Sequence, residues 1–528
     1  MPRFRTAAVA TLFVVPIVAG GFLLQKPPVR ANAALFEQVA SLVRNQYVDT
    51  IPTAAVYEKA AKGLVHELND PYSELLPPKE SEAFNRQTGG RYGGTGMLLG
   101  NPSKGVFTVD RVFPNTPAEE AGVREGDHIV SVDSTPTVGL AIDQVSNLLR
   151  GEPGSRVNVV YSRPGVTELI RLKFTRRVVH VPAVTYSTIV GDHIGYLPLQ
   201  TFNENTAEEV SAAVEGLAKQ GARSIILDMR DNGGGIVEQS LRTASLFLQP
   251  GQEIASVRSR NQPTETLRAQ GKHLDKQIPL VVMVDGGSAS ATEIVAGALQ
   301  DHDRALIVGT NSFGKGLVQS VYTLNGGYNL KLTTGKWFTP SGRSIHRERK
   351  LLENGEFVEV HPDSLKAADM ARPTFKSDAG RVVYGGGGIR PDVLVADDTL
   401  TKAERDFLRV AAPLGPRINK VLQDYALELK GTVPRDFAVP AVWPTELMRR
   451  LAADSVKIDS KYEAAEREFL TRDLANRVAR MTYGDASAKL RVIAEDKPLT
   501  RAIELLQRST TQAQLLAAAP PQPAPTRK

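Results

Sequence analysis

The sequence predicts an α/β core that follows a small, mostly β module, with α-helical extensions at both the N- and C-terminal ends. Between residues 179 and 400, buried β runs such as "SIILDMR" and "PLVVMVD" alternate with amphipathic helical stretches such as "TAEEVSAAVEGLAKQ", an order typical of α/β folds. Between residues 91 and 178, short β runs are broken by glycine, which is typical of a small β domain. The chain has 528 residues and is 41% apolar, so it can form several domains with cores of their own.

Charge and cysteine content exclude several classes of function. The 64 basic and 58 acidic residues leave a formal net charge of +6 without a long basic block, which argues against a nucleic-acid-binding protein. The chain has no cysteine, so it has neither thiolate zinc sites nor a cysteine nucleophile. We expect no metal and no other cofactor.

Residues 1–33 are predicted to be a signal peptide or a membrane anchor. Arg3 and Arg5 precede an apolar run over residues 6–24, and small residues at 31–33 offer a cleavage site. The run is also about as long as a membrane span requires, so the cleaved and the anchored form both stay open. Either form predicts an exported protein that works in the periplasm or faces it from the inner membrane.

Residues 34–90 are predicted to be an N-terminal helical segment, because apolar residues such as Leu35, Val39 and Leu42 recur at helical spacing. The β module that follows, over residues 91–178, opens with the glycine loop Gly93–Met97. Adjacent backbone N–H groups in such a loop can bind an anion beside an open strand edge. A peptide that adds to the edge as a strand would place its terminal carboxylate there.

The stretch "NTPAEEAGVREGDHIVSVDS" in this module resembles the middle of a PDZ domain. This resemblance implies that the carboxylate-binding loop runs from Gly94 to Met97. The implied donors are the N–H groups of Thr95, Gly96 and Met97.

Two junctions stand out in the α/β region, because functional groups gather where strands end and helices begin. "LDMRDNGGGI" and "VDGGSASATE" each follow a buried strand. In the second, Ser290 and Glu293 have the spacing of a helix capping box. A serine at a sharp turn from strand into helix also has the geometry that acyl-transfer enzymes use. The junction alone leaves both interpretations open.

A serine nucleophile needs a base, and the eight histidines form no recognisable motif. Lys315 is the better candidate, since it is flanked by glycines and preceded by Phe313, surroundings that can keep a lysine neutral. The same stretch suggests a rival, because Gly309–Lys315 matches the first seven positions of a phosphate-binding P-loop. Gly316 stands where that motif needs Ser or Thr, and a β pattern follows where it needs a helix. Both features speak against nucleotide binding.

Five motifs together resemble the carboxyl-terminal processing peptidases of bacteria and plastids. They are, in chain order, "LDMRDNGGG", "VDGGSASATEIVAGALQD", "GTNSFGKGLVQ", "FTPSGRSI" and "GGGGIRPDV". The resemblance covers about residues 68–393. It implies a PDZ-containing serine endopeptidase with a Ser/Lys dyad that cleaves exported proteins near apolar C-termini. The alternative is a PDZ scaffold, or peptide-binding protein, on an inactive peptidase core.

Carried over residue by residue, the resemblance makes Ser290 the nucleophile, because Lys315 follows it at the family's spacing of 25 positions. Lys315 is then the general base. Gln319, four residues further on, matches the glutamine that orients the lysine. Asp301 matches an acidic position that we expect to hold the end of a helix.

The resemblance also implies an oxyanion hole built from backbone amides. One amide would come from Ala291 and a second from Gly234 or Gly235. Gly233 stands where the family usually has proline, so the choice between these two glycines stays open.

Three regions lie outside the motifs. Residues 346–384 form an insertion of mixed charge without an assigned role. Residues 401–510 are predicted to be helical, and two interpretations stay open: a surface that contacts an adaptor or a second copy of the chain, and a solvated helical bundle. Residues 511–528 are predicted to be a disordered Pro/Ala-rich tail, whose "LLAAA" resembles the apolar ends of the family's substrates. We therefore expect that the enzyme trims itself or occludes its own site with this tail.

Overall fold

The computed structural model describes residues 27–100, 107–163, 165–260, 262–274, 278–351, 357–359, 372–396 and 400–520. The chain divides into two compact units. The first comprises residues 1–78, 319–333 and 349–358, and the second comprises the rest. The predicted signal or anchor run at residues 6–24 lies outside the described residues. Within the described ranges, none of the helices has the length and apolar character that a membrane crossing requires.

The first unit contains the N-terminal helices, which differ from the predicted segment in two respects. Helix α2 (Pro27–Gln46) begins before the expected boundary at residue 34, and Pro52 precedes a separate helix α3 (Thr53–His66). Strand β1 (Glu74–Leu76) follows and pairs antiparallel with Asn329–Lys331 of β18 (Asn329–Phe338). The unit also holds most of β17 (Leu317–Thr323) and the short η1 (Asn325–Gly327). The N-terminal segment is therefore two helices and a strand rather than one helical stretch.

The second unit begins with helix α4 (Pro78–Gly89) and the predicted β module. The module's elements are β2 (Arg91–Gly94), β3 (Met97–Leu99), β4 (Phe107–Val112), α5 (Pro117–Glu120), β5 (His128–Val132), β6 (Thr135–Pro136), α6 (Ile142–Leu149), β7 (Arg156–Ser162), β8 (Ile170–Thr175) and β9 (Arg177–His180). Its sheet has the order β3-β4-β5-β7-β8, with β6 beside β5. Strand β3 therefore lies at an edge. Strands β2 and β9 pair antiparallel, so the two ends of the module lie together.

A six-stranded sheet forms the centre of the α/β region, as expected. Its order is β10 (Thr188–Val190), β11 (Ile194–Pro198), β12 (Ser224–Asp228), β15 (Leu280–Val284), β16 (Leu306–Gly309) and β23 (Val393–Leu394). Strand β10 is antiparallel to β11, and each of the remaining neighbouring pairs is parallel. The carboxyl ends of β12 and β15 therefore meet at one edge of the sheet, which brings the two predicted junctions together.

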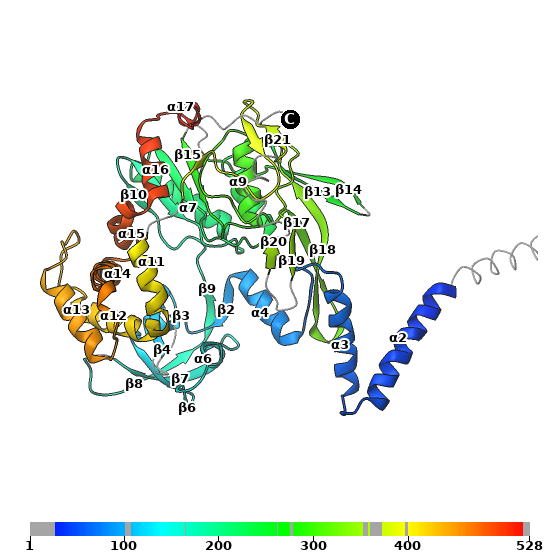
Figure 1. Cartoon of the computed structure of the whole chain (residues 1–528), viewed down its shortest axis with the longest axis horizontal. Helices are drawn as coiled ribbons and strands as arrows, with labels where there is room; N and C mark the ends of the chain where they lie inside the picture. The colour runs from blue at the N-terminus through cyan, green and yellow to red at the C-terminus, as the bar shows by residue number, and fades with distance from the viewer. Residues whose placement is uncertain are drawn as a thin grey trace, which may run out of the picture. The chain divides into compact units, whose positions relative to one another are not determined.

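Helices cover both faces of this sheet. Helices α7 (Thr206–Lys219), α8 (Val237–Ser245) and α9 (Ala291–Asp301) pack on the face that carries Leu227 and Val282. The alternate residues Ile226 and Met283 point to the opposite face, where helix α16 (Lys497–Gln507) packs. Figure 1 shows α16, in red, and α9, in green, beside the same strands. Because both faces are buried, these strands are apolar throughout.

Smaller sheets complete the second unit. Strands β13 (Glu253–Ser259) and β14 (Gln262–Arg268) pair antiparallel, and β13 also pairs with Gly335–Phe338 of β18. The predicted insertion at residues 346–384 contains β19 (Arg349–Leu351), β20 (Phe357–Glu359), β21 (Thr374–Lys376) and β22 (Val382–Tyr384). Strand β19 and residues 357–358 of β20 belong to the first unit, whereas β21 and β22 pair with each other in the second.

The C-terminal helical region has two parts. Helices α11 (Lys402–Ala411), α12 (Gly415–Leu429), α13 (Val442–Ala453) and α14 (Glu463–Tyr483) bury a core of their own. After α15 (Asp485–Val492) and the short η5 (Ile493–Glu495), helices α16 and α17 (Gln512–Ala517) join the core of the α/β sheet.

The expectation of disorder from residue 511 onward was wrong for the first part of that segment. Residues Gln512–Ala517 are helical, with Leu515 fully buried against the sheet and Leu516 packed beside it. The Gln512 side chain also accepts a hydrogen bond from the Leu280 amide at 2.8 Å. Leu515, Leu516 and Ala519 of the apolar "LLAAA" thus pack in the core, whereas Ala517 and Ala518 are exposed, so the stretch is not a free apolar end. Residues 521–528 lie outside the described residues.

Candidate active site

Ser290 lies where β15 turns into α9, as the sequence predicted. It is the N-cap residue of the helix and has a positive φ of 58°, a strained conformation for a residue with a side chain. Its hydroxyl does not accept a hydrogen bond from the first turn of the helix; the Glu293 amide donates instead to the Ser290 carbonyl oxygen at 2.9 Å. The side chain is only partly buried. The turn therefore presents a hydroxyl that the helix end does not use.

Ser288 has a structural role in the same turn. Its side chain is fully buried, donates to the Met229 carbonyl at 2.8 Å and accepts from the Asp285 amide at 2.9 Å. A hydroxyl with these two bonds joins the ends of β12 and β15, and it is inaccessible to a substrate.

Glu293 connects Ser290 with the segment that carries Lys315. One carboxylate oxygen, Oε2, accepts from the amides of Ser290 and Lys315, both at 2.8 Å. The other, Oε1, accepts from the Ser312 hydroxyl at 2.5 Å and from the Gly314 amide at 2.7 Å. Burial raises the pKa of the Glu293 carboxyl, and these four hydrogen bonds oppose that shift by stabilising its ionised form. A single buried carboxylate thus fixes both backbones.

Lys315 follows β16 in the loop that the sequence singled out. Its side chain is partly buried, and its carbonyl oxygen accepts from the Trp337 indole N–H at 3.1 Å. Residues Leu317–Thr323 form a strand, which is the pattern that argued against a P-loop. Gln319 lies in this strand and its side-chain amide donates to the Tyr72 carbonyl. The orienting role predicted for Gln319 stays a prediction.

The glycine run comes close to Ser290. Gly234 has a φ of +97°, and a Cβ added there would lie 2.9 Å from the Ala291 nitrogen and 3.0 Å from Ser290 Cβ. The Gly234 amide, however, donates to the Asn232 side-chain oxygen at 3.0 Å. In this structure, therefore, Gly234 lines the turn without offering its amide. Within the described ranges, the amides of Gly235 and Ala291 have no hydrogen-bond acceptor.

Asp301 is the last residue of α9. Its carboxylate is almost fully buried, accepts from the Arg343 guanidinium at 2.7 Å and accepts from the Ser341 amide at 3.0 Å. These contacts hold the helix end against residues 339–343, which agrees with the structural role that the sequence suggested.

The glycine loop of the β module joins β2 to the edge strand β3. The carbonyl oxygens of Thr95 and Gly96 accept from the amides of Ala118 and Phe113, at 2.8 and 2.9 Å. The carboxylate-binding role predicted for the N–H groups of Thr95, Gly96 and Met97 stays a prediction.

The sequence analysis predicted the roles of two site residues incompletely or not at all. Glu293 was recognised only as a helix cap, because nothing in its own stretch indicates that residues 312–315 return to it. Asn232 was not singled out, although its buried side chain binds the Gly234 amide and the Leu199 carbonyl. Its own carbonyl accepts from the Ala289 amide at 3.0 Å and the Thr292 hydroxyl at 2.8 Å. An Asn two residues before a glycine was the available signal, because Asx turns have that spacing.

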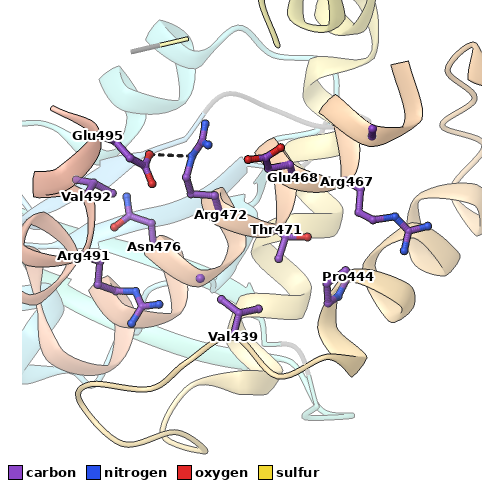
Figure 2. Close-up of a pocket in the computed structure, with 12 residues that line it drawn as sticks. Val439, Pro444, Arg467, Glu468, Thr471, Arg472, Asn476, Arg491, Val492 and Glu495 are labelled. Atoms are coloured by element: carbon purple, nitrogen blue, oxygen red, sulfur yellow. Dashed lines mark ion pairs between the residues drawn. The ribbon is translucent and has the colours of Figure 1, made fainter. Parts of the chain in front are cut away.

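A cavity of about 520 Å³ lies in the C-terminal helical region and is drawn in Figure 2. Its lining includes Val439, Arg472 and Arg491, and none of the predicted site residues belongs to it. The described residues contain no group of three or more His, Asp or Glu side chains arranged to hold a metal ion.

Two family models match the chain. The model described as peptidase family S41 matches residues 193–363, which include the Ser290 turn and Lys315. The model described as PDZ domain matches residues 108–163. Fold and site thus define the class: an α/β peptidase core with a PDZ domain and a helical C-terminal region.

Curated relatives narrow this class to one family. The carboxy-terminal-processing protease of Bartonella bacilliformis is 37% identical over 59% of this chain and 72% of its own length. The carboxy-terminal processing protease CtpA of Bacillus subtilis is 30% identical over 65% of this chain and 73% of its own length. The chain belongs to the family of carboxy-terminal processing proteases, which are serine peptidases of family S41.

A third relative is matched over a smaller share of its own length. A probable CtpA-like serine protease of Staphylococcus haemolyticus is 33% identical over 60% of this chain, and the match spans 63% of that protein's length. Among solved structures, the photosystem II D1 C-terminal processing protease is 30% identical, with a TM-score of 0.36 over 69% of this chain and 87% of that chain.

Proposed function

We propose that this chain is a serine endopeptidase in which Ser290 is the nucleophile and Lys315 the general base. The observation that carries the proposal is the Glu293 carboxylate, which binds the amides of both residues at 2.8 Å. Catalysis needs a nucleophile and a base in a fixed relation. A structural turn would not require a buried carboxylate shared between these two positions.

The reaction proceeds in two steps. Neutral Lys315 accepts the Ser290 proton while Oγ attacks the peptide carbonyl carbon, and the C–N bond breaks as the lysine ammonium protonates the leaving amine. A water molecule then gives a proton to Lys315 and attacks the acyl ester, and the C–O bond to Ser290 breaks as Lys315 returns that proton to Oγ. The amides of Ala291 and Gly235 are the candidate donors to the oxyanion. Gln319 orients Lys315.

The substrates are exported proteins with apolar C-terminal regions. The PDZ domain supports this part of the proposal, because the loop Gly94–Met97 precedes the edge strand β3, and an edge strand accepts a peptide by strand addition. The N-terminal apolar run supports an exported enzyme, periplasmic or anchored in the inner membrane. An adaptor or a second copy would bind the C-terminal helices.

The proposal is tested with an unstructured protein that ends in an apolar sequence. The wild type should cleave it, whereas Ser290→Ala and Lys315→Ala should each lower kcat/KM by more than about 1,000-fold. Lys402→Ala, which alters a lysine whose side chain is 86% exposed, serves as the control. Binding without cleavage by the wild type would favour the alternative, a PDZ scaffold on an inactive core.

A further inference from the structure

A cluster of four charged side chains lies beside the glycine run and has no part in the proposed chemistry. Arg230 donates to both oxygens of Asp228, at 2.7 to 3.2 Å, and to both oxygens of Asp496, at 2.8 and 3.0 Å. Lys489 donates to Asp496 at 2.6 Å. These side chains are between 6 and 16% exposed. Buried charges that pair this closely are expensive to separate.

Arg230 lies between the end of β12 and the glycine run. Asp228 ends β12, and Asn232, two residues after Arg230, binds the Gly234 amide and the Ala289 amide, which precedes Ser290. The Arg230 backbone is itself tied to this strand end, because its amide donates to Asp228 at 3.1 Å. The guanidinium therefore fixes the direction in which residues 231–235 leave the sheet.

Asp496 reaches this cluster from the C-terminal region. It is the N-cap residue of α16, and its side chain accepts from the Leu499 amide at 3.0 Å. The preceding residue, Glu495, pairs with Arg472 of α14 at 2.9 Å, as Figure 2 shows. Neighbouring carboxylates thus attach one short segment to the helical region on one side and to the peptidase core on the other.

The same segment contacts the PDZ domain. Asp485, the first residue of α15, pairs with Arg111 of β4 at 3.0 Å. Residues 485–496 therefore contact three parts of the second unit: the PDZ domain, the helical region and the strand end that leads into the glycine run.

We infer that Asp496 is a positioning residue of the active site, which acts by holding Arg230 and, through it, the glycine run beside Ser290. The inference rests on the proposed function. Without the Asp496 carboxylate, Arg230 loses its two hydrogen bonds to the N-cap of α16, and the strand end loses this link to the helix. The glycine run then samples positions in which its amides no longer face the oxyanion, so transition-state binding weakens more than substrate binding.

The test uses the full chain with Asp496→Asn. Asparagine is as good an N-cap as aspartate, so the start of α16 is retained, while the charge is lost and one oxygen that accepts from Arg230 is replaced by an NH₂ donor. We expect kcat for a peptide substrate to fall about tenfold with KM changed less than about twofold. Inhibition by a peptide boronic acid, whose tetrahedral adduct needs the oxyanion donors, should weaken by a similar factor.

The matched control is Glu446→Gln. Glu446 also accepts hydrogen bonds from two cations, Arg449 and Arg450 at 2.7 to 2.8 Å, but it lies on α13, within the separate helical core. Its kcat should stay at the wild-type value. Asp496→Glu, which retains the carboxylate, should restore part of the lost kcat and separates positioning from folding.

Two results would overturn the inference. One is a wild-type kcat and boronate affinity in Asp496→Asn, even with a lower Tm, because Asp496 would then only stabilise the fold. The other is an equal loss of activity in Glu446→Gln. Absence of cleavage by the wild-type protein would instead contradict the proposed function itself, so the two failures are distinguishable.

Discussion

Glu293 shows how one side chain can hold together the two segments that carry the proposed nucleophile and the proposed base. Its four hydrogen bonds come from residues 290 and 312–315, which are adjacent in space only because β15 and β16 are neighbours in the sheet. Each oxygen accepts two donors, so the site requires a group that accepts at both ends. A carboxylate is the only side-chain group that meets this requirement.

Glu293→Gln should therefore be damaging although it preserves the shape of the side chain. The amide NH₂ of glutamine would face two N–H or O–H donors in either orientation. We expect kcat to fall at least about tenfold and the free energy of unfolding to fall by about 1–3 kcal/mol. Steady-state kinetics and urea unfolding measure the two effects. Glu208→Gln, at an exposed carboxylate, should change neither, and wild-type kinetics in Glu293→Gln would contradict the assigned role.

Gly234→Ala should abolish most activity for a steric reason. An added Cβ would lie 2.7 Å from the Ala289 carbonyl oxygen and 2.9 Å from the Ala291 nitrogen, and a φ of +97° disfavours a side chain. The backbone beside Ser290 must move, so we expect kcat/KM to fall by about 100-fold or more. Gly233→Ala is the matched control, because a Cβ there meets nothing within 4 Å. Equal activity of the two variants would show that the glycine run does not form part of the site.

At the residue scale, the sequence predicts the groups proposed to carry the chemistry but not the side chains that hold them in place. Ser290 and Lys315 follow from their motifs and spacing. Asp496 could not be found in this way, since it is 206 positions from Ser290 and has the ordinary pattern of a helix N-cap. Its partner Arg230 sits in a recognised motif, yet nothing in that motif says which carboxylate completes the pair.

At the scale of elements, α16 forms the helical layer on the second face of the peptidase sheet. Leu499, Ala502 and Leu506 pack against Ile226 and Met283, on the face opposite α9. The amphipathic pattern of this helix was visible in the sequence, but a helix pattern does not specify which sheet it covers. Its place was therefore predicted in a separate helical region rather than in the core.

Leu499→Ala tests the layer directly. The side chain is fully buried, so its truncation should lower the free energy of unfolding by about 2–5 kcal/mol. Urea unfolding followed at the peptidase core, for example by proteolysis of β11–β12, measures the change. Leu490→Ala, at a leucine that is 39% exposed, should cost less than about 1 kcal/mol. An intact core in Leu499→Ala would mean that α16 is dispensable.

The charge cluster at the start of α16 should make stability depend on acid pH. Burial raises the pKa of Asp496, but hydrogen bonds and charge from Arg230 and Lys489 outweigh it and lower the pKa to about 2. Because the folded pKa lies below the usual 3.8, the stabilisation is fully present above about pH 4 and is lost as pH falls through about 2. It amounts to about 2 kcal/mol. Unfolding of wild type and Asp496→Asn should therefore differ at pH 6 and converge near pH 2, and a constant difference would contradict this origin.

At the scale of the whole molecule, the PDZ domain is joined to the chain in a way that allows its removal. Arg91 and His180 are cross-strand partners in the β2–β9 pair, so a short Gly/Ser linker can replace residues 91–180. The shortened protein should still cleave, but it should lose the wild-type preference for a substrate with a free terminal carboxylate over the same substrate amidated. Competition between these two peptides measures the preference. An unchanged preference would place carboxylate recognition outside the PDZ domain.

The position of α16 and α17 has a consequence for the timing of activity during synthesis. Chains fold from the N-terminus as they emerge, and Ser290 and Lys315 are made long before Leu515. Until residues 497–517 have emerged, one face of the peptidase sheet lacks its cover and Arg230 lacks Asp496. A nascent chain therefore carries the proposed nucleophile and base before the layer that covers the sheet behind them, and we expect protease activity only after these late residues have been translated.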